Sequence, residues 1–517
     1  MAQPHREVEI KLEIDPAAVK RLTRYLRAHA NLREAPQVND LRSVYFDTKR
    51  QRLRRKGFSL RVREIGGQRV QTIKHSGNGA AGLFERAEWE ETIEGRDPDW
   101  KVAKRSGLAP LVNKKLRARA KPVFETRVRR TSYRVRGRGG DIKLVLDEGS
   151  IKADARSTPV AEIELEVEKG RPATAFEFAR ALARIAPLIL STKSKAERGY
   201  DLLAGEQAQA VKSAPVPLTA EMTVEQAFRA IGHECLRHFA ANRAAVCQGD
   251  LEGVHQMRVG LRRMRAAISL FSDAVNDSRL PRIKAELKWL TKELAPARDL
   301  DVFLAEMPRL PRRLAISGGE GFRDELTARR ERAHERAEQA ASSDRFRTLL
   351  LDVAQWLEGG PWTRAGGAPG KRRAQAIEDF TVDELSRRRK KIKKRARKLK
   401  ALDPGQRHKL RIASKKLRYG VEFCAALFDG KRSRKRRKAF LGALKDLQSA
   451  LGGLNDVAAR EQLAAAVAAK RHANGAKPQR AFAAGWITAQ EEARAKPLLK
   501  AAAKAGRALR DARPPWA

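Results

Sequence analysis

The chain of 517 residues has 109 Lys and Arg against 62 Asp and Glu, a net charge of +47, and 42% of its residues are hydrophobic. This length exceeds that of one ordinary domain, and the apolar content excludes a wholly disordered chain. So large a positive excess predicts a polyanionic partner: nucleic acid, an anionic membrane or phosphate chains. Composition alone does not choose among these three.

The sequence contains only three cysteines, Cys235, Cys247 and Cys424, and no Cys-x-x-Cys pair. This excludes a disulfide framework and argues against a zinc site with thiolate ligands. It favours a reducing compartment. The first residues are dense in charge, unlike a secretory signal, and no run of about 18 apolar residues predicts a transmembrane helix. We therefore expect a soluble, cytoplasmic protein without a membrane partner.

The first part of the chain shows the period-two alternation that is typical of β-strands. Near the N-terminus, Val8, Ile10, Leu12 and Ile14 alternate with charged residues. The pattern predicts about eight strands, at 8–14, 43–48, 59–64, 70–75, 84–93, 123–135, 142–151 and 160–168. Helices are predicted at 17–30, near 104–118 and at 172–185.

A different pattern begins after residue 203. Residues 204–220 include Pro215 and Pro217 and few apolar anchors, which predicts a linker. Beyond it the hydrophobic period becomes helical, and glycine-rich segments interrupt it at 317–321 and 359–370. We predict three parts: a β-domain at 1–203, a linker at 204–220, and a helical domain at 221–512 with two repeats at about 221–360 and 371–512.

Charged residues form one-faced rows on several predicted strands. Residues two apart share a strand face, so Glu7, Glu9 and Lys11 form one such row. Taken alone, this row is best read as the solvent side of a half-buried strand. The pattern recurs, however, in the acidic row Glu162, Glu164 and Glu166, in the basic pairs Arg61/Arg63 and Arg127/Arg129, and in Lys74 and Asp147 among apolar neighbours.

Like charges at strand spacing repel and require compensation. Divalent cations would compensate the glutamate rows, and the opposing Arg and Lys side chains would suit a substrate with many phosphate charges. About eight strands are enough to close into a ring with an interior lined by alternate residues. The pattern therefore predicts a phosphate-processing tunnel.

At this point the sequence resembles the CYTH superfamily, the triphosphate tunnel metalloenzymes. Glu7-Val-Glu-Ile-Lys11 matches the Glu-x-Glu-x-Lys signature of that family. Further motifs follow in family order over residues 5–200: Tyr45-Phe-Asp-Thr48, Leu60-Arg-Val-Arg63, Thr72-Ile-Lys74, Leu146-Asp147, Glu162-Ile-Glu-Leu-Glu166 and Ser194-Lys-Ala-Glu-Arg-Gly-Tyr200. The resemblance implies an eight-stranded antiparallel tunnel that hydrolyses triphosphates with Mg²⁺ or Mn²⁺; some family members cyclise ATP.

The resemblance also implies roles for residues. Metal-binding acids would be Glu7, Glu9, Asp147, Glu162, Glu164 and Glu166, and phosphate-binding bases would be Lys11, Arg61, Arg63, Lys74, Arg127, Lys195 and Arg198. Glu7, Glu9 and Lys11 are the predicted catalytic residues. One metal would bridge phosphate oxygens and a second would activate water, with Lys11 orienting that water or assisting proton transfer. The choices between Arg127 and Arg129 and between Lys193 and Lys195, and the roles of Glu88 and Glu90, remain open.

A basic stripe is repeated in the helical part, at an offset of 153 positions. His255, Arg258, Arg262, Arg263 and Arg265 match His408, Arg411, Lys415, Lys416 and Arg418. At helical spacing, most of each set falls on one narrow arc, separate from an apolar arc. One such stripe would usually be a solvated face, but its repetition favours a duplicated bundle with a shared function. Metal binding by the two histidines is a weaker reading, because no acids stand at ligand spacing.

This duplicated stripe resembles the CHAD family, the conserved histidine α-helical domain, over about 220–510. The resemblance implies two pseudo-symmetric four-helix bundles with a basic cavity that binds inorganic polyphosphate through the ten residues of the stripe. The predicted fold class is thus α+β: an eight-stranded antiparallel β-tunnel with flanking helices, then an all-α duplicated four-helix-bundle domain. Lys415 and Lys416 replace arginines, which puts bidentate phosphate contacts there in doubt.

The predicted function is metal-dependent hydrolysis of inorganic triphosphate in the tunnel, with polyphosphate binding by the helical domain. Thiamine triphosphate, nucleoside triphosphates and adenylyl cyclase activity are alternatives within the same enzyme class. A non-catalytic protein that targets itself to polyphosphate bodies is the alternative from another class. Non-specific nucleic-acid binding is expected as a side property, because residues 387–400 are almost continuously basic.

Overall fold

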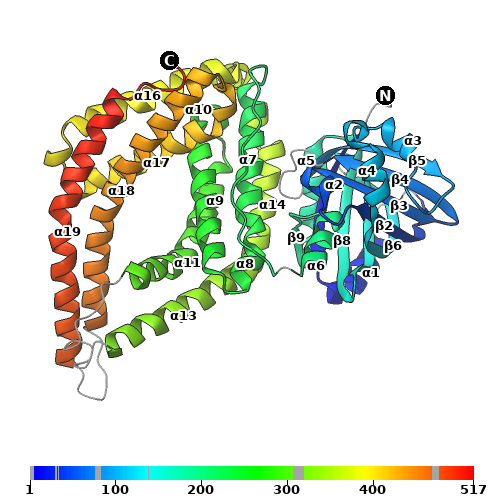
Figure 1. Cartoon of the computed structure of the whole chain (residues 1–517), viewed down its shortest axis with the longest axis horizontal. Coiled ribbons are helices and arrows are strands. Elements are labelled where there is room, and N and C mark those ends of the chain that lie inside the picture. The colour runs from blue at the N-terminus through cyan, green and yellow to red at the C-terminus, as the bar shows by residue number, and fades with distance from the viewer. Residues whose placement is uncertain are drawn as a thin grey trace. The chain divides into compact units, whose positions relative to one another are not determined.

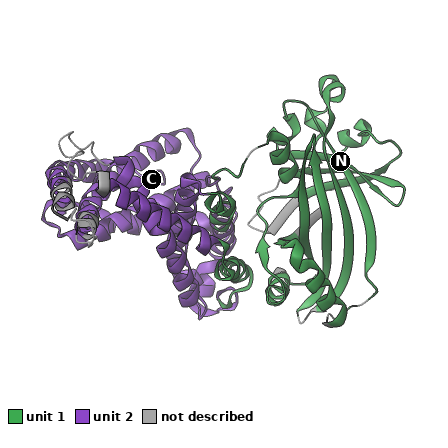
Figure 2. Cartoon of the chain, turned by 90° about the horizontal axis from the view of Figure 1, so that it is seen from below, with its two compact units in different colours: residues 1–211, 236–248, 342–361 green, residues 212–235, 249–341, 362–517 purple. Residues whose placement is uncertain are grey.

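The computed structural model describes residues 5–29, 32, 34–75, 83–137, 139–205, 207–306, 320–468 and 477–517. The chain divides into two compact units (Figure 2). The first unit consists of residues 1–211, 236–248 and 342–361, and the second of residues 212–235, 249–341 and 362–517. The predicted domain limits at 203 and 221 remain predictions, because the units follow spatial contacts and not sequence boundaries.

The first unit is built on a nine-stranded antiparallel sheet (Figure 1). Its strands are β1 (His5–Ile14), β2 (Gln37–Asp47), β3 (Phe58–Ile65), β4 (Gln68–His75), β5 (Leu83–Ile93), β6 (Lys121–Gly137), β7 (Gly140–Ala153), β8 (Arg156–Gly170) and β9 (Leu188–Leu190). Their order is β5-β4-β3-β2-β6-β7-β8-β1-β9, and β5 also pairs with β1. The first eight strands therefore form a closed ring.

The prediction of eight strands is thus one short. The eight predicted strands are those of the ring, whereas β9 extends the sheet beyond it by pairing with Leu12–Ile14 of β1. A strand of three residues is too short for alternation to reveal. The predicted helix near 104–118 is also divided, into α3 (Trp100–Lys104), a 3₁₀ turn (Ala109–Leu111) and α4 (Lys114–Arg119).

Two apolar clusters hold the flanking helices against the ring. One joins Phe46, Leu60 and Ile73 of the sheet to α2 (Arg52–Arg55), α3 and α4. The other joins Tyr45, Phe124 and Val128 to Tyr200 of α6 (Lys195–Ala204). Each fully buried large apolar side chain contributes about 1.5–3 kcal/mol, so the two clusters hold the flanking helices firmly on the strands.

Helix α6 begins at Lys195. Ser194 caps the helix through a capping box with Glu197, which fixes where the helix begins. Gly199 allows close approach to β6, because a Cβ at this position would overlap the ring of Phe124. Tyr200 donates a hydrogen bond of 2.9 Å to Asp47 of β2. These contacts set the position of Lys195 relative to the ring.

The remaining helices of the first unit are α1 (Pro16–His29) and α5 (Pro172–Leu182), close to their predicted ranges. Helix α14 (Asp344–Gly359) belongs to the same unit and packs on α5. Arg180 of α5 forms an ion pair with Asp352 of α14. Residues 207–219 form neither helix nor strand, although Val216 and Leu218 are buried.

From residue 224 on, the described chain is helical apart from short turns and one isolated bridge. Besides α14, the α-helices are α7 (Val224–Ala241), α8 (Arg243–Cys247), α9 (Leu251–Leu270), α10 (Ser272–Val275), α11 (Leu280–Glu306), α13 (Glu320–Ser342), α15 (Gly367–Ala374), α16 (Ile377–Arg397), α17 (Pro404–Phe423), α18 (Lys431–Ala468) and α19 (Lys477–Asp511). None of the helices in the described ranges is long and apolar enough to cross a membrane. The α+β class is confirmed, and the duplication into two four-helix bundles remains a prediction.

Candidate functional site

A cavity of about 540 Å³ is lined by side chains from all eight strands of the ring and from α6. Most of its lining is charged. The cations are Lys11, Arg61, Arg63, Lys74, Arg105, Arg130, Lys143 and Lys195, and the carboxylates are Glu9, Glu88, Glu90, Glu91, Glu164 and Glu166. An interior of this kind is costly to fold unless its charges are paired, so its ion pairs determine what it can bind.

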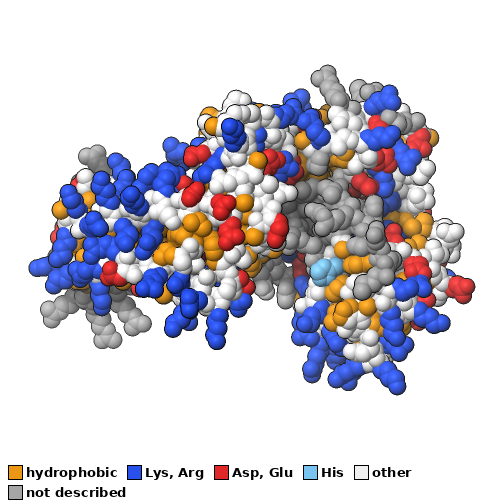
Figure 3. Space-filling view, turned by 90° about the horizontal axis from the view of Figure 1, so that it is seen from above, with side chains coloured by type: hydrophobic (Ala, Val, Ile, Leu, Met, Phe, Trp, Pro, Cys, Tyr) orange, Lys and Arg blue, Asp and Glu red, His pale blue; other side chains and the backbone are white. Residues whose placement is uncertain are grey.

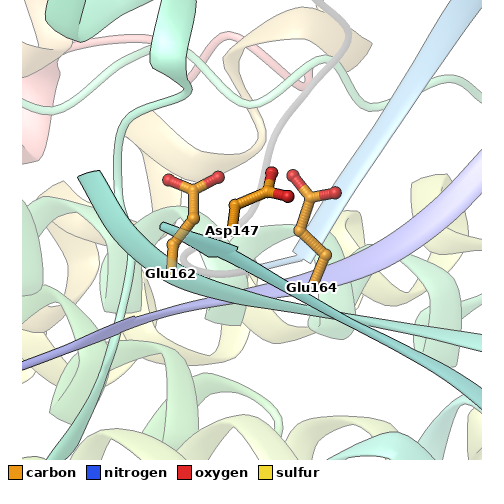
Figure 4. A group of neighbouring side chains, drawn as sticks. All are labelled: Asp147, Glu162 and Glu164. Atoms are coloured by element: carbon orange, nitrogen blue, oxygen red, sulfur yellow. The ribbon is translucent and has the colours of Figure 1, made fainter. Parts of the chain in front are cut away.

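Three buried carboxylates meet where β7 and β8 lie side by side (Figure 4). Asp147, Glu162 and Glu164 each offer an oxygen within 4.8 Å of the others, and we call them the acid triad. Asp147 pairs with Glu162 across the two strands, and Glu164 is two residues further along β8 on the same face. Strand geometry therefore dictates the grouping.

Lys195 and Arg130 both form ion pairs with the acid triad. Lys195 Nζ lies 2.7 Å from Asp147 Oδ2 and 3.1 Å from Glu164 Oε1, and it also forms an ion pair with Glu162. Arg130 donates two hydrogen bonds to Asp147, of 2.8 and 2.7 Å, and one of 3.0 Å to Glu164. Burial alone would raise the pKa of Asp147 and Glu164, but these cations and Lys11 outweigh it and lower both pKa values.

Lys11 of β1 connects the triad to the N-terminal signature. Its ammonium lies 2.9 Å from Glu9 Oε1 and forms an ion pair with Glu164, which faces it across β1 and β8. Burial would lower the pKa of Lys11, but the attraction of Glu164 and Glu9 prevails and raises it. Lys11 therefore stays protonated near neutral pH, which favours an orienting role over acceptance of a proton.

The opposite wall of the cavity is basic and comes from β3 and β4. Arg61 lies 3.9 Å from Glu88 and 3.7 Å from Glu90, and Lys74 lies 2.7 Å from Glu88. Arg63 donates a hydrogen bond of 3.1 Å to Ser43, and burial together with repulsion from Arg61 and Arg130 lowers its pKa to about 10. The buried Nε of Arg61 has no hydrogen-bond partner among the described residues. An anion would supply the missing acceptor.

The structure corrects the prediction for Arg127. Its side chain is 58% exposed, pairs with Glu125, and does not line the cavity, whereas Arg130 does. Odd and even residues of β6 face opposite ways, which puts Arg127 and Arg129 on the face away from Arg130. The sequence could not show this, because apolar residues occur at both parities of the strand, in Phe124 and Val128 and again in Tyr133 and Val135.

The other predicted residues fall in different places. Glu9, Glu164 and Glu166 line the cavity, and Glu166 lies 3.0 Å from Lys143. Glu7 is in β1 opposite Arg86, but its side chain lies outside the described residues. Arg198 donates a hydrogen bond to Pro159 O and lies 3.8 Å from Glu162, and Lys193 pairs with Asp201; neither lines the cavity. Glu88 and Glu90, whose roles were open, are cavity residues, as is Tyr45.

The acid triad has the chemistry of a site for a hard divalent cation. All its ligand atoms are carboxylate oxygens, and Glu162 Oε2 is buried without a hydrogen-bond partner among the described residues. Asp147, Glu162 and Glu164 are the residues that would hold such an ion, with Glu9 and Glu166 on the adjoining cavity wall.

In the second unit, the predicted stripe divides into two groups. Helices α9 and α17 pack together, and one group gathers Arg258, Arg262, Arg411, Lys415 and Arg418, which we call the basic ridge. Buried Nε atoms of four ridge arginines have no hydrogen-bond partner among the described residues. Arg298 of α11 also lies near the ridge: burial, and then repulsion from Arg298 and the ridge arginines, lowers the pKa of His255. The predicted stripe did not include Arg298.

The other members of the stripe have different partners. Arg263 is buried, lies 3.3 Å from Glu422 and stacks over Phe423, so it serves packing. Burial, and then repulsion from Arg388 and Arg265, lowers the pKa of Lys416. His408 forms a hydrogen bond of 2.8 Å with Asn455. In Figure 3, Lys and Arg side chains cover much of the visible face of the second unit.

A closed antiparallel ring with a charged interior, combined with a helical unit bearing a basic ridge, defines a two-module protein. Residues 5–200 match the CYTH domain family and residues 230–465 match the CHAD domain family. The chain thus belongs to the proteins that join a CYTH domain to a CHAD domain, as the sequence motifs predicted.

Individual proteins are similar to parts of the chain. The inorganic triphosphatase of Haemophilus influenzae is 30% identical over 203 residues, which are 39% of this chain and 56% of that protein. The chain therefore matches about half the length of that relative. The crystal structure of the CHAD domain from the plant Ricinus communis is 29% identical, with a TM-score of 0.51 over 59% of this chain and 99% of that one. PptA from Streptomyces chartreusis is 19% identical, with a TM-score of 0.42 over 55% of this chain and 99% of that one.

Proposed function

We propose that the ring cavity hydrolyses inorganic triphosphate to pyrophosphate and phosphate with Mg²⁺ or Mn²⁺, and that the helical unit binds polyphosphate. The observation that carries the first part is a single cavity with a basic wall on β3 and β4 and an acid triad with Lys11 on the other side. The similarity of residues 5–200 to the CYTH family, and to an inorganic triphosphatase, supports it.

The charge of the cavity supports a substrate that arrives with metal. Eight cations and six carboxylates line it, and Asp147 and Glu162 also pair with Lys195, so the site has no positive surplus. A linear triphosphate carries about four negative charges at neutral pH, one on each phosphate and at least one more shared by its two ends. Divalent cations held by the carboxylates would balance this charge.

The residues divide the work of phosphoryl transfer. Arg61, Arg63 and Lys74 would bind the phosphate chain, which suits a reaction that depends on positioning and charge neutralisation. The metal, when bound, supplies Lewis acidity and a water of lowered pKa. Lys11 remains an ammonium that holds Glu9 and Glu164 in place and can orient the attacking water.

The cavity lining favours an inorganic substrate over an organic one. Tyr45 and Trp89 are the aromatic residues that line it. The ring of Tyr45 is stacked on that of Phe124, with centroids 4.5 Å apart, so Phe124 already covers one face of it. A thiamine or nucleobase moiety would need apolar or aromatic contacts in addition to charge. Thiamine triphosphate, nucleoside triphosphates and cyclisation of ATP are therefore the alternatives that a substrate panel must exclude.

The proposal of polyphosphate binding rests on the basic ridge. Buried guanidinium Nε groups without acceptors imply an anionic partner, and several cations along two packed helices suit an extended chain of phosphates. Nucleic acid would bind the same charges without sequence preference. We still predict that the protein lies in the cytoplasm and associates with polyphosphate bodies.

Phosphate release from triphosphate, thiamine triphosphate, pyrophosphate, ATP and long polyphosphate, each with Mg²⁺, Mn²⁺ or chelator, tests the proposal. We expect release from triphosphate above all others, and none with chelator. No release from any substrate would contradict hydrolysis and favour the non-catalytic polyphosphate-binding protein. Binding competition between polyphosphate and DNA at several salt concentrations tests the second part, because the preferred ligand must win at each concentration.

A further inference from the structure

Lys195 occupies the centre of the acid triad. Its ammonium pairs with all three carboxylates, at 2.7 Å from Asp147 and 3.1 Å from Glu164 and in an ion pair with Glu162. An ammonium has three N–H donors, so each carboxylate can accept one of them. The Lys195 side chain is 9% exposed, and those of Asp147 and Glu162 are fully buried. The lysine thus stands where a divalent cation would find its ligands.

The charges of the triad are already largely compensated. Its three carboxylates and Glu9 face Lys195, Arg130 and Lys11, so four negative charges meet three positive ones. Adding a divalent cation to this buried group would leave uncompensated positive charge, which is strongly unfavourable in a region of low dielectric constant. Binding of metal therefore requires one of the three cations to withdraw.

Lys195 is the cation best placed to withdraw. Arg130 is held by two hydrogen bonds to Asp147, and Lys11 is also held by Glu9 at 2.9 Å. Lys195 is the one of the three whose ammonium pairs with every carboxylate of the triad, so it occupies the position where the ligand atoms of a cation would meet. A cation bound there therefore displaces Lys195 before Arg130 or Lys11.

We propose that Lys195 is a displaceable counter-ion, which holds the metal position among Asp147, Glu162 and Glu164 and leaves it for the cavity when a divalent cation binds. The inference rests on the proposed function in taking the cavity as the place that receives a phosphate chain. Phosphate gives the displaced ammonium a new partner, so metal and substrate bind cooperatively. A lysine that only gripped phosphate would have no effect on metal binding in the absence of phosphate.

Mn²⁺ binding to the full-length protein, followed by electron paramagnetic resonance without any phosphate, tests this directly. Lys195→Met keeps an unbranched side chain but removes the competing charge, so we expect it to bind Mn²⁺ about tenfold or more tightly than the wild type. Lys193→Met removes a lysine that pairs with Asp201 and does not line the cavity. This control should bind Mn²⁺ as the wild type does. Unchanged or weaker binding by Lys195→Met would overturn the inference.

Thermal unfolding supplies a readout that does not depend on affinity measurements. Without metal, Lys195→Met should melt below the wild type because its carboxylates have lost a partner, and Mn²⁺ should raise its melting temperature by more than that of the wild type. If neither Lys195→Met nor Lys195→Gln folds even with Mn²⁺, the metal does not replace the ammonium and the inference fails. Phosphate release by the wild type together with unchanged Mn²⁺ affinity in Lys195→Met would contradict this inference alone, leaving the proposed function intact.

Discussion

The two units use positive charge in opposite ways. In the ring cavity, Lys11, Lys74, Arg130 and Lys195 each pair with a carboxylate at 3.1 Å or less. On the basic ridge, two arginines pair with acids, Arg258 with Asp299 at 3.3 Å and Arg418 with Glu422 at 3.5 Å. The other three cations, Arg262, Arg411 and Lys415, mainly face other cations. A site of paired charges requires metal and phosphate together, whereas a site with an excess of cations requires only an anion. The predictions below separate these two modes.

The largest effect is expected from Glu164→Gln, which removes the carboxylate that Lys11, Lys195 and Arg130 share. Leaving buried cations without this partner costs about 3–5 kcal/mol of the free energy of unfolding. Phosphate release should fall below detection, and polyphosphate binding by the helical unit should be unchanged. Glu168→Gln, on the same strand but paired with Arg134 near the surface, is the matched control. Full activity of Glu164→Gln would contradict the proposed site.

A matched pair on β6 compares Arg130, which lines the cavity, with Arg127, which does not. Arg130→Ala should lower kcat/KM for triphosphate by about 10²-fold or more, since it removes charge-assisted bonds within the cavity. Arg127→Ala, on the exposed face, should remain within about twofold of the wild type. The reverse order of effects would restore the sequence-based assignment. Steady-state kinetics measures both variants.

The basic ridge predicts a smaller and separate effect. Arg262→Ala together with Arg411→Ala should weaken polyphosphate binding about 10- to 100-fold, because each charge-assisted hydrogen bond contributes about 1.5–3 kcal/mol before losses to flexibility. Triphosphate hydrolysis should not change. Arg434→Ala, an exposed arginine paired with Asp429, controls for the loss of surface charge. If the control weakens binding equally, attraction is diffuse and the ridge is not a site.

The smallest effect is a pH dependence of binding to the ridge. Burial, followed by repulsion from Arg411, Arg262 and Arg418, lowers the pKa of Lys415 to about 7, although Asp456 opposes the shift. A bound anion stabilises the ammonium and raises this pKa, so binding takes up a proton and affinity should fall as pH rises above about 7. The decrease is at most about tenfold per pH unit.

Isothermal titration in buffers of different ionisation enthalpy measures the protons taken up. Lys415→Arg keeps its charge at every accessible pH and should therefore bind with little pH dependence between pH 6 and 9. A pH profile of Lys415→Arg that equals that of the wild type would assign the titration to another group.

Much of the ring was predictable because its signal is local. Alternation predicted each of the eight ring strands, and motif order brought Glu9, Lys11, Arg61 and Glu164 to one cavity. Two features depend on packing and could not be predicted. Strand β9 is too short to show alternation. In β6, apolar residues occur at both even and odd positions, so the sequence does not show whether Arg127 or Arg130 faces the cavity. The repeat at an offset of 153 positions likewise grouped Arg263 with the stripe, although Arg263 is buried and packs against Phe423.

Helix α6 approaches β6 closely at Gly199, so the size of residue 199 affects where the charge of Lys195 lies in the cavity. The helix can bring Lys195 into the triad only because position 199 has no side chain to push it off Phe124. Even a methyl group there would tilt or lift the helix by its own size. A neutral substitution that touches neither metal nor phosphate would thereby move a charge within the cavity. Variation at this position can tune the site while every charged residue in it is retained.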